Sequence, residues 1–138
     1  MATINPYLNF YGNAEEAFNF YKSVFGGELT VLERFKDTPE AEKLSARDRE
    51  KIMHVSLPIG NGTVLMATDS LESMGHTLTV GDNFSISISA ENKEEAHRLF
   101  DKLSTGGKVI VPLEKASWGS YFGMLKDRFG IQWMVSYD

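Results

Sequence analysis

The residues of this chain that could do chemistry are few. Its 138 residues include three histidines and no cysteine, which excludes thiolate nucleophiles, disulfides and zinc–thiolate sites. His54 is the histidine best placed for chemistry, because it lies in a stretch that alternates apolar and polar residues, as a half-buried strand does. An unperturbed imidazole titrates near neutrality and could serve as a hydrogen-bond donor or a general base. The alternative is a structural histidine that only braces neighbouring strands.

The carboxylates and serines point to no familiar catalytic set. Glu33 and Asp69 are the acids nearest to His54 on expected strands, and no second acid pairs with either, so a two-carboxylate mechanism has no support. Serine is too abundant for its spacing to define a Ser-His-Asp order. Any chemistry therefore depends on which elements bring side chains to His54.

The helices that position these residues occur twice. The phrase Asn13-Ala14-Glu15-Glu16-Ala17 is echoed 79 residues later by Asn92-Lys93-Glu94-Glu95-Ala96. Each phrase opens an amphipathic pattern, with an Asn as expected N-cap and a Glu pair in the first turn, where the helix dipole favours acids. Gly26-Gly27 and Gly106-Gly107 follow these patterns as C-terminal glycines do. The spacing predicts helices over 14–25 and 93–104.

A second repeat predicts two hairpins. "GTVLMA" (62–67) aligns with "GIQWMV" (130–135) at an offset of 68 residues, and alternating runs precede both. Gly62 and Gly130 lie where a hairpin loop at 60–62, or its counterpart, requires a left-handed residue. The Gly60-x-Gly62 pair is therefore turn chemistry and no nucleotide loop, since a strand and no helix follows it.

The complete pattern is a βαβββ unit stated twice, which predicts an α+β fold in one domain over 1–138. Module one covers about 1–69, a linker 70–82, and module two about 83–138. Residues 36–51 are polar and charged, and a short helix is expected from Thr38-Pro39. The expected strands lie at 3–10, 28–35, 52–59, 63–69, 83–90, 108–113, 119–126 and 131–137.

Strand alternation predicts which side chains line a pocket. In the first hairpin Ile59 should oppose Thr63 and Ser56 should oppose Met66. This register turns Val55, and every second residue from it, toward the helix. The opposite face of this hairpin should line the ligand pocket. The corresponding face of module two, with Trp118 beside it, should line the pocket as well. The predicted pocket residues are His54, Ser56, Met66, Thr68, Ser85, Ser87, Trp118, Phe122, Met124, Gln132 and Met134.

The bulk composition excludes several classes of partner. The net charge is −5, and the basic residues are interleaved with acids, so no basic stripe exists for nucleic acid. No run approaches the roughly 18 apolar residues of a membrane span, and no N-terminal apolar block resembles a signal peptide. The lack of cysteine fits a reducing cytoplasm, where we expect the protein to reside.

Three segments carry a family resemblance: "PYLNFYGNAEEAFNFYKSVFGGEL" (6–29), "IMHVSLPIGNGTVLMATD" (52–69) and "WGSYFGMLKDRFGIQWMVSY" (118–137). With the tandem βαβββ units, they resemble the PhnB-like branch of the vicinal oxygen chelate superfamily, which includes glyoxalase I, extradiol dioxygenases and bleomycin-resistance proteins. The resemblance implies curved sheets with helices on one face and a ligand cavity on the other. It also implies a homodimer.

The resemblance implies a metal site whose ligands are missing here. Metal-dependent members place ligands, usually His and Glu, on the first and last strand of each module. Those places carry over to Pro6, Met66, Ser85 and Met134. Proline offers no ligand, a lone serine is poor, and thioethers suit soft Cu(I) better than Fe, Ni, Mn or Zn. We therefore predict no metal and no cofactor.

These observations favour one function and leave others open. The leading hypothesis is a metal-independent small-molecule-binding protein of the glyoxalase/bleomycin-resistance type with a mostly apolar cavity. The alternatives are a lyase, isomerase or dioxygenase with a non-standard metal site, and an interaction module. Some members of the branch carry a label as ubiquinone-pathway methyltransferases, but no strand-to-helix glycine loop for a methyl donor is visible.

Overall fold

The computed structural model describes residues 1–60 and 62–138, and it divides the chain into two compact units, 1–79 and 80–138. The boundary falls inside the expected linker 70–82. The predicted hairpin loop 60–62 includes residue 61, which lies outside the described residues. Within the described part of the chain, no helix combines the length and the apolar character needed to cross a membrane.

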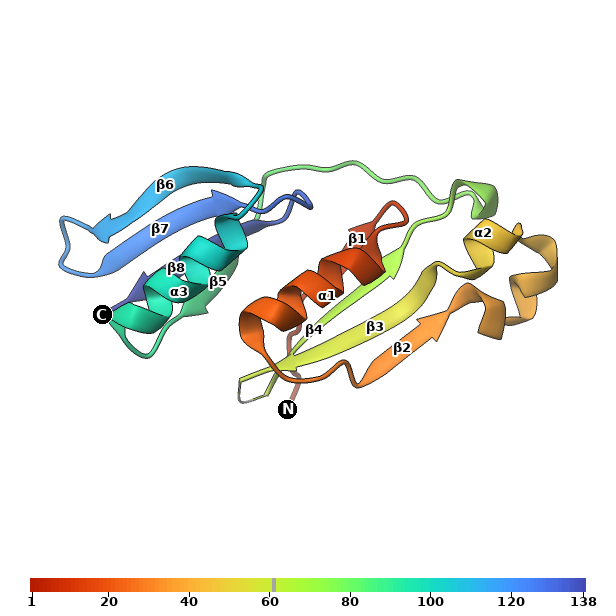
Figure 1. The fold of residues 1–138 in the computed structure, drawn as a ribbon, viewed down its shortest axis with the longest axis horizontal. Helices are drawn as coiled ribbons and strands as arrows, with labels where there is room; N and C mark the ends of the chain where they lie inside the picture. Colours follow the sequence, from red (N-terminus) through yellow and green to blue (C-terminus); the bar gives the residue numbers. More distant parts are fainter. Residues whose placement is uncertain (61) are drawn as a thin grey trace. The chain divides into compact units, whose positions relative to one another are not determined.

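Both units contain the predicted βαβββ series (Figure 1). The elements of unit one are β1 (Tyr7–Phe10), α1 (Ala14–Phe25), β2 (Val31–Arg34), η1 (Phe35–Asp37), η2 (Pro39–Lys43), α2 (Ala46–Arg49), β3 (Ile52–Ile59), β4 (Thr63–Asp69) and η3 (Glu72–Met74). Those of unit two are β5 (Ile86–Ser89), α3 (Lys93–Ser104), β6 (Lys108–Lys115), β7 (Tyr121–Lys126) and β8 (Gln132–Tyr137).

Each unit forms one four-stranded sheet with the same topology. The strand order is β1-β4-β3-β2 in unit one and β5-β8-β7-β6 in unit two. In both sheets the first strand pairs in parallel with the last, and the other pairs are antiparallel. The single long helix lies over one face of its sheet and connects the two edge strands (Figure 1). This arrangement confirms the α+β fold with two modules.

The core of each unit lies between its helix and the covered face of its sheet. In unit one, Val55, Leu57, Leu65 and Ala67 are at most 1% exposed and lie on the α1 side of the sheet. In unit two the predicted helical face is buried in full: Ala96, Leu99, Phe100 and Leu103. In α1 the buried residues are Ala14, Ala17, Phe18, Tyr21 and Val24. Phe18 is fully buried there, whereas Phe20 is only half-buried.

The predicted helices and the strands of the first hairpin agree with the structure at both ends, whereas the edge strands differ. The first strand of each unit begins later than expected, at Tyr7 and Ile86, and β2 covers only Val31–Arg34. β6 is longer than expected, because Pro112 and the two register shifts that flank Val111 interrupt the pairing with β7 without ending the strand. Edge strands are paired on one side only, so the alternation of apolar residues defines them poorly.

The polar segment 36–51 contains three short helical turns where one was expected. The 3-10 turn η2 begins at Pro39, as the Thr38-Pro39 pair predicted, and η1 and α2 flank it. A small apolar cluster of Phe35, Leu44 and Leu71, with Met53 packed against it, anchors this segment to unit one.

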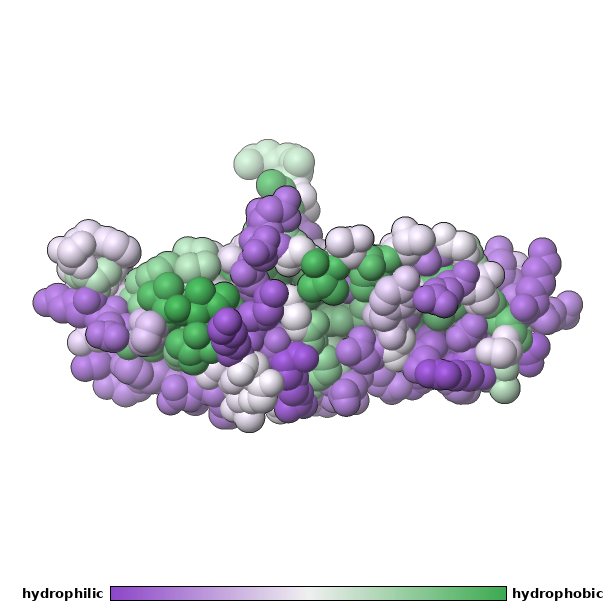
Figure 2. Space-filling model, turned by 90° about the horizontal axis from the view of Figure 1, so that it is seen from above, coloured by the Kyte–Doolittle hydropathy of each residue, from purple (hydrophilic) through white to green (hydrophobic). Residues whose placement is uncertain are grey.

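Apolar side chains are also exposed on one edge of unit two. Val109, Ile110 and Val111 of the edge strand β6 are 37–44% exposed. Figure 2 shows apolar side chains gathered where unit two carries β6, whereas hydrophilic side chains cover much of the rest of the visible face. An apolar edge strand of this kind is a template for association with another chain.

Candidate functional site

The predicted register of the first hairpin is correct. Ser56 pairs with Met66 and Ile59 pairs with Thr63 in the β3–β4 ladder. His54, Ser56, Met66 and Thr68 therefore share the sheet face opposite α1, which we call the open face of unit one. A slip of one residue would have turned this set toward the helix.

His54 is the centre of a hydrogen-bonded group on this open face. Its Nδ1 atom lies 3.2 Å from the Tyr7 hydroxyl, and its Nε2 atom lies 3.0 Å from the Ser56 hydroxyl. The rings of Tyr7 and His54 also stack, with centroids 5.6 Å apart. Both ring nitrogens thus have protein partners, so the imidazole edge is already engaged. These contacts are compatible with the bracing role that the sequence left open, and a ligand contact of His54 stays a prediction.

Tyr7 is the functional candidate that the sequence analysis missed. It is 46% exposed, whereas Ser56 at the other end of the group is 5% exposed. Partial burial raises the pKa of the Tyr7 phenol, an effect that a hydrogen bond from Thr68 partly opposes. The hydroxyl is therefore protonated at neutral pH. The alternation in "YLNF" could have found it, since Leu8 and Phe10 are buried and Tyr7 must face the other way.

A carboxylate adds negative charge to the same face. Glu33 on β2 pairs with His54 in the ladder, so their side chains lie on one side of the sheet. Glu33 is exposed. The open face of unit one therefore combines hydroxyls, an imidazole, one thioether and one exposed acid.

The open face of unit two is more apolar. Met124 pairs with Met134, and Phe122 pairs with Ser136, as their alternation predicted. The Trp118 ring, which is 68% exposed, lies 5.9 Å from the Phe122 ring between centroids. Phe122, Met124 and Met134 stand on one sheet, and Trp118 adds its ring from the turn between β6 and β7.

The polar members predicted for unit two differ in their placement. Ser87 pairs with Met134 and joins the open face, whereas Ser85 precedes β5 and is outside the sheet. Gln132 uses its amide nitrogen to donate to the carbonyls of Asp82 and Phe84, at 3.0 Å and 2.7 Å. Gln132 therefore fastens the segment before β5. A single cavity shared by the two open faces stays a prediction.

The metal positions carried over from the resemblance do not fit a metal. The residues that share a ladder position with Met66 and Met134 are Tyr7 and Ser87, and Pro6 and Ser85 lie outside the strands. The corrected set offers a phenol, a hydroxyl and two thioethers, which suit Fe, Ni, Mn or Zn poorly. Across residues 1–60 and 62–138, no three His, Cys, Asp or Glu side chains are grouped as metal ligands would be.

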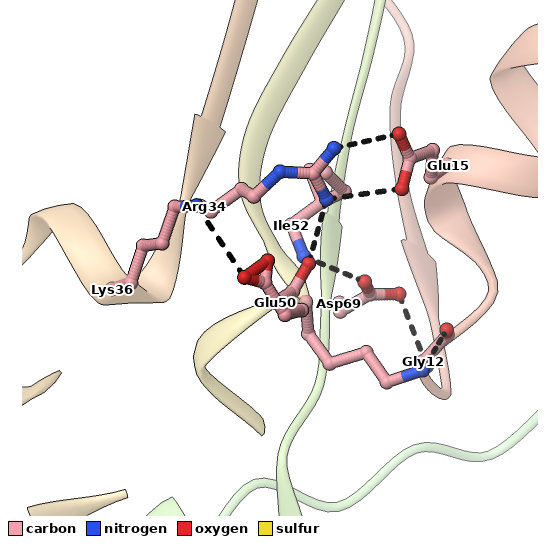
Figure 3. Close-up of a pocket in the computed structure, with 8 residues that line it drawn as sticks. Gly12, Glu15, Arg34, Lys36, Glu50, Ile52 and Asp69 are labelled. Carbon is pink, nitrogen blue, oxygen red and sulfur yellow. Dashed lines mark hydrogen bonds and ion pairs between the residues drawn. The ribbon is translucent and has the colours of Figure 1, made fainter. Parts of the chain in front are cut away.

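A separate cleft of about 490 Å³ lies at the end of unit one where α1 begins (Figure 3). Arg34 donates to both carboxylate oxygens of Glu15, at 2.7 Å and 3.0 Å, and to the Glu50 carbonyl at 2.7 Å. The Arg34 guanidinium lowers the pKa of Glu15, and the Glu15 carboxylate raises that of Arg34. The Lys51 ammonium donates to the Gly12 carbonyl at 2.8 Å. Arg34 and Glu15 form an ion pair, and Lys51 is bound to a backbone carbonyl. The charged groups of the cleft are therefore engaged by the protein itself.

Asp69 closes the floor of this cleft and is 1% exposed. One carboxylate oxygen accepts from the amide of Gly12 at 3.0 Å, and the other accepts from the amide of Ile52 at 2.8 Å (Figure 3). The first oxygen also accepts from the amide of Ala14 at 3.0 Å. Asp69 thus caps α1 and joins it to the start of β3. Asn13, the expected cap, makes no side-chain capping bond. Asp69 is structural, and no local pattern in the sequence predicts its partners.

Together, the paired βαβββ units and their open faces define a protein of the vicinal oxygen chelate fold. Glyoxalase/bleomycin-resistance proteins share this architecture. One such family enzyme from Burkholderia phytofirmans PsJN matches 95% of this chain and 95% of its own, with a TM-score of 0.64 and 15% identity. That likeness shows the fold.

The family model described as 3-demethylubiquinone-9 3-methyltransferase matches residues 2–136, and the chain belongs to this family, the PhnB-like branch of the superfamily. Protein PA1353 from Pseudomonas aeruginosa is 39% identical, with a TM-score of 0.87 over 100% of this chain and 98% of that one. A putative 3-demethylubiquinone-9 3-methyltransferase, PhnB protein, from Bacillus cereus is 28% identical, with a TM-score of 0.80 over 99% and 100%. Protein YjdN from Escherichia coli is 29% identical over 96% of this chain and 93% of its own.

Proposed function

We propose that this protein binds a small organic molecule on the open faces of its sheets without the help of a metal, in the manner of a glyoxalase/bleomycin-resistance type binding protein. The observation that carries the proposal is the composition of those faces. In place of metal-ligating carboxylates and imidazoles, they hold the Tyr7–His54–Ser56 group and the apolar set of Trp118, Phe122, Met124 and Met134. Small-molecule sites combine apolar walls with a few placed polar groups in this way.

The methyl transfer in the family's name is not part of the proposal. A methyl donor with a carboxylate would need open amides at the turn between a strand and a helix. In unit one the amides of Gly12 and Ala14 at that turn are bound by Asp69. The turn is therefore filled by the protein's own carboxylate.

The proposal is tested by what the purified protein retains. Organic extraction followed by mass spectrometry should yield a small molecule in a ratio near one per chain or per pair of chains, and elemental analysis after dialysis should find well under one metal per chain. Trp118→Ala should reduce the retained molecule, while the control Trp118→Phe keeps an aromatic ring there. A full equivalent of Ni, Zn, Mn or Fe per chain contradicts the proposal.

We further propose a homodimer as the working form. The exposed apolar strand β6 supports it, because a second copy would bury Val109, Ile110 and Val111. Sedimentation should give twice the chain mass, and Ile110→Lys should shift the distribution toward the monomer. The matched control, Lys108→Arg on the same strand, should not. A wild-type protein that sediments as a monomer at micromolar concentration contradicts a stable dimer.

A further inference from the structure

Burial fixes the direction of the hydrogen bonds on the open face of unit one. The Ser56 side chain is 5% exposed, and its partner in the described part of the chain is the His54 Nε2 atom, 3.0 Å away. A buried hydroxyl that donates to nothing is costly, so Ser56 must donate its hydrogen to Nε2. Nε2 then acts as acceptor, and in the neutral ring the proton resides on Nδ1.

The rest of the chain of bonds follows from that proton. With a hydrogen on Nδ1, His54 donates to the Tyr7 oxygen, 3.2 Å away. Tyr7 then keeps its own hydrogen, for which the neighbouring Thr68 hydroxyl and an external acceptor compete, and nearly half of the residue is exposed. The Ser56 hydroxyl therefore donates to the His54 imidazole, the imidazole donates to the Tyr7 oxygen, and the Tyr7 hydroxyl is the last donor of this series. Such a series strengthens its last donor, because each bond polarises the next.

The surroundings of Tyr7 indicate which ligand suits this donor. Its ring stacks on His54 and is partly accessible, which suits a second flat ring in an offset stack. Its ladder partner is the thioether of Met66, a favourable neighbour for aromatic rings. Glu33 stands on the same face beside His54 and disfavours an anion.

We propose that Tyr7 is the ligand-binding and specificity-determining residue of this face, that Ser56 and His54 are positioning residues, and that the site takes a neutral planar aromatic molecule whose carbonyl oxygen accepts the Tyr7 hydrogen bond. The inference rests on the proposed function and names the class of ligand for it. It differs from the sequence-based prediction, which assigned the ligand contact to His54.

The test uses two probes of the same shape on the full-length protein. 2-Acetylnaphthalene carries the carbonyl oxygen, and 2-isopropenylnaphthalene replaces that oxygen by a methylene group. Wild-type protein should bind the ketone about three- to tenfold more tightly, the range expected for one net hydrogen bond. Tyr7→Phe keeps the ring and should bind both probes alike. Tyr121→Phe is the matched control, because Tyr121 lies beside His97 and Lys93 of α3, and it should keep the preference.

A second readout separates positioning from packing. Nitrogen-15 spectra of His54 should show the tautomer with the proton on Nδ1. Ser56→Ala should shift His54 toward the other tautomer and weaken the ketone preference, although Ser56 does not touch the ligand. A thermal melt of each variant confirms folding.

Several outcomes overturn the inference. They are equal binding of the two probes by wild-type protein, a ketone preference that survives Tyr7→Phe, and a His54 proton on Nε2. Failure of both probes to bind also overturns it. None of these outcomes contradicts the proposed function, because that proposal is tested by the retained small molecule and the metal content.

Discussion

The two open faces differ, although the scaffold beneath them is the same. The hairpin offset of 68 residues places Phe122 where unit one has His54, and Met124 where it has Ser56. Tyr7 pairs with Met66 in unit one, and Ser87 pairs with Met134 in unit two. Ser87 therefore occupies the position that corresponds to Tyr7. The imidazole of His54 and the hydroxyl of Ser56 thus correspond to the apolar side chains of Phe122 and Met124, and only Ser87 keeps a hydroxyl in this set. The two units can therefore differ on the faces away from their helices while their helix-covered cores keep the same arrangement.

The covered faces differ in a compensating way. Val55 pairs with Ala67 in unit one, whereas the equivalent pair in unit two is Gly123 with Val135. The larger residue has changed strands, and the space under the helix is filled in both cases. Buried positions must conserve volume, since interiors are closely packed.

The caps of the two helices provide the largest predicted contrast. Asp69→Ala should lower the free energy of unfolding by about 3 kcal/mol or more, because it leaves three amides without their charged acceptor. Asn92→Ala should cost about 1 kcal/mol, since Asn92 bonds only the Glu95 amide at the start of α3. Urea denaturation of both variants measures the difference. Equal losses would mean that Asp69 is no more than an ordinary cap.

The next largest expected effect on stability concerns Gly123, a small residue in the core of unit two. A methyl group on Gly123 would lie 2.7 Å from a Phe100 ring carbon and 2.9 Å from the Leu113 Cα atom. Gly123→Ala should therefore destabilise the protein by about 1–3 kcal/mol through overpacking. Ser87→Ala, on the exposed side of the same sheet, should change stability by less than about 0.5 kcal/mol. A Gly123→Ala variant as stable as the wild type would show that this layer can expand.

Replacing residues on the open face of unit one by their counterparts in unit two tests how far the hydrogen-bonded group contributes to stability. His54→Phe installs the residue of unit two and leaves the buried Ser56 hydroxyl without its acceptor, at a cost of about 1 kcal/mol. Adding Ser56→Ala removes that hydroxyl and should recover most of the loss. Chemical denaturation of the two single variants and the double variant gives the coupling energy. Strictly additive losses would show that the two side chains are independent.

The ion pair between Arg34 and Glu15, one of those in unit one, has the smallest expected effect. Arg34→Gln should cost up to about 1 kcal/mol at neutral pH, because both side chains are partly exposed and screened. The pKa of Glu15 is lowered in the folded protein, so its stabilisation is present above the ordinary value of 4.5 and disappears as the pH falls below it. The difference between the thermal melts of wild type and variant should shrink in acid to the part that comes from the Arg34 bond to the Glu50 carbonyl. A difference as large at pH 3 as at neutral pH would exclude this ionisation as its source.

Local patterns were sufficient for most of the fold. The helices 14–25 and 93–104 and the strands 52–59 and 63–69 follow from apolar spacing and turn glycines, and their observed bounds agree. Gly62 and Gly130 have φ of 98° and 90°, as the hairpins required. Alternation also placed His54 on the open face, because a strand allows its side chains only two directions.

Only the tertiary structure decided which side chains meet. The echoed phrases at Asn13 and Asn92 predict the same cap, yet Asn92 caps its own helix, whereas α1 is capped by Asp69 from 55 residues away. Likewise, Tyr7 meets His54 across 47 residues of sequence and, with Ser56, occupies both ring nitrogens. Sequence periodicity specifies the face on which a side chain stands, because that depends on neighbouring backbone angles. The partner depends on which strands lie side by side and in what register, and so on the packing of the whole unit.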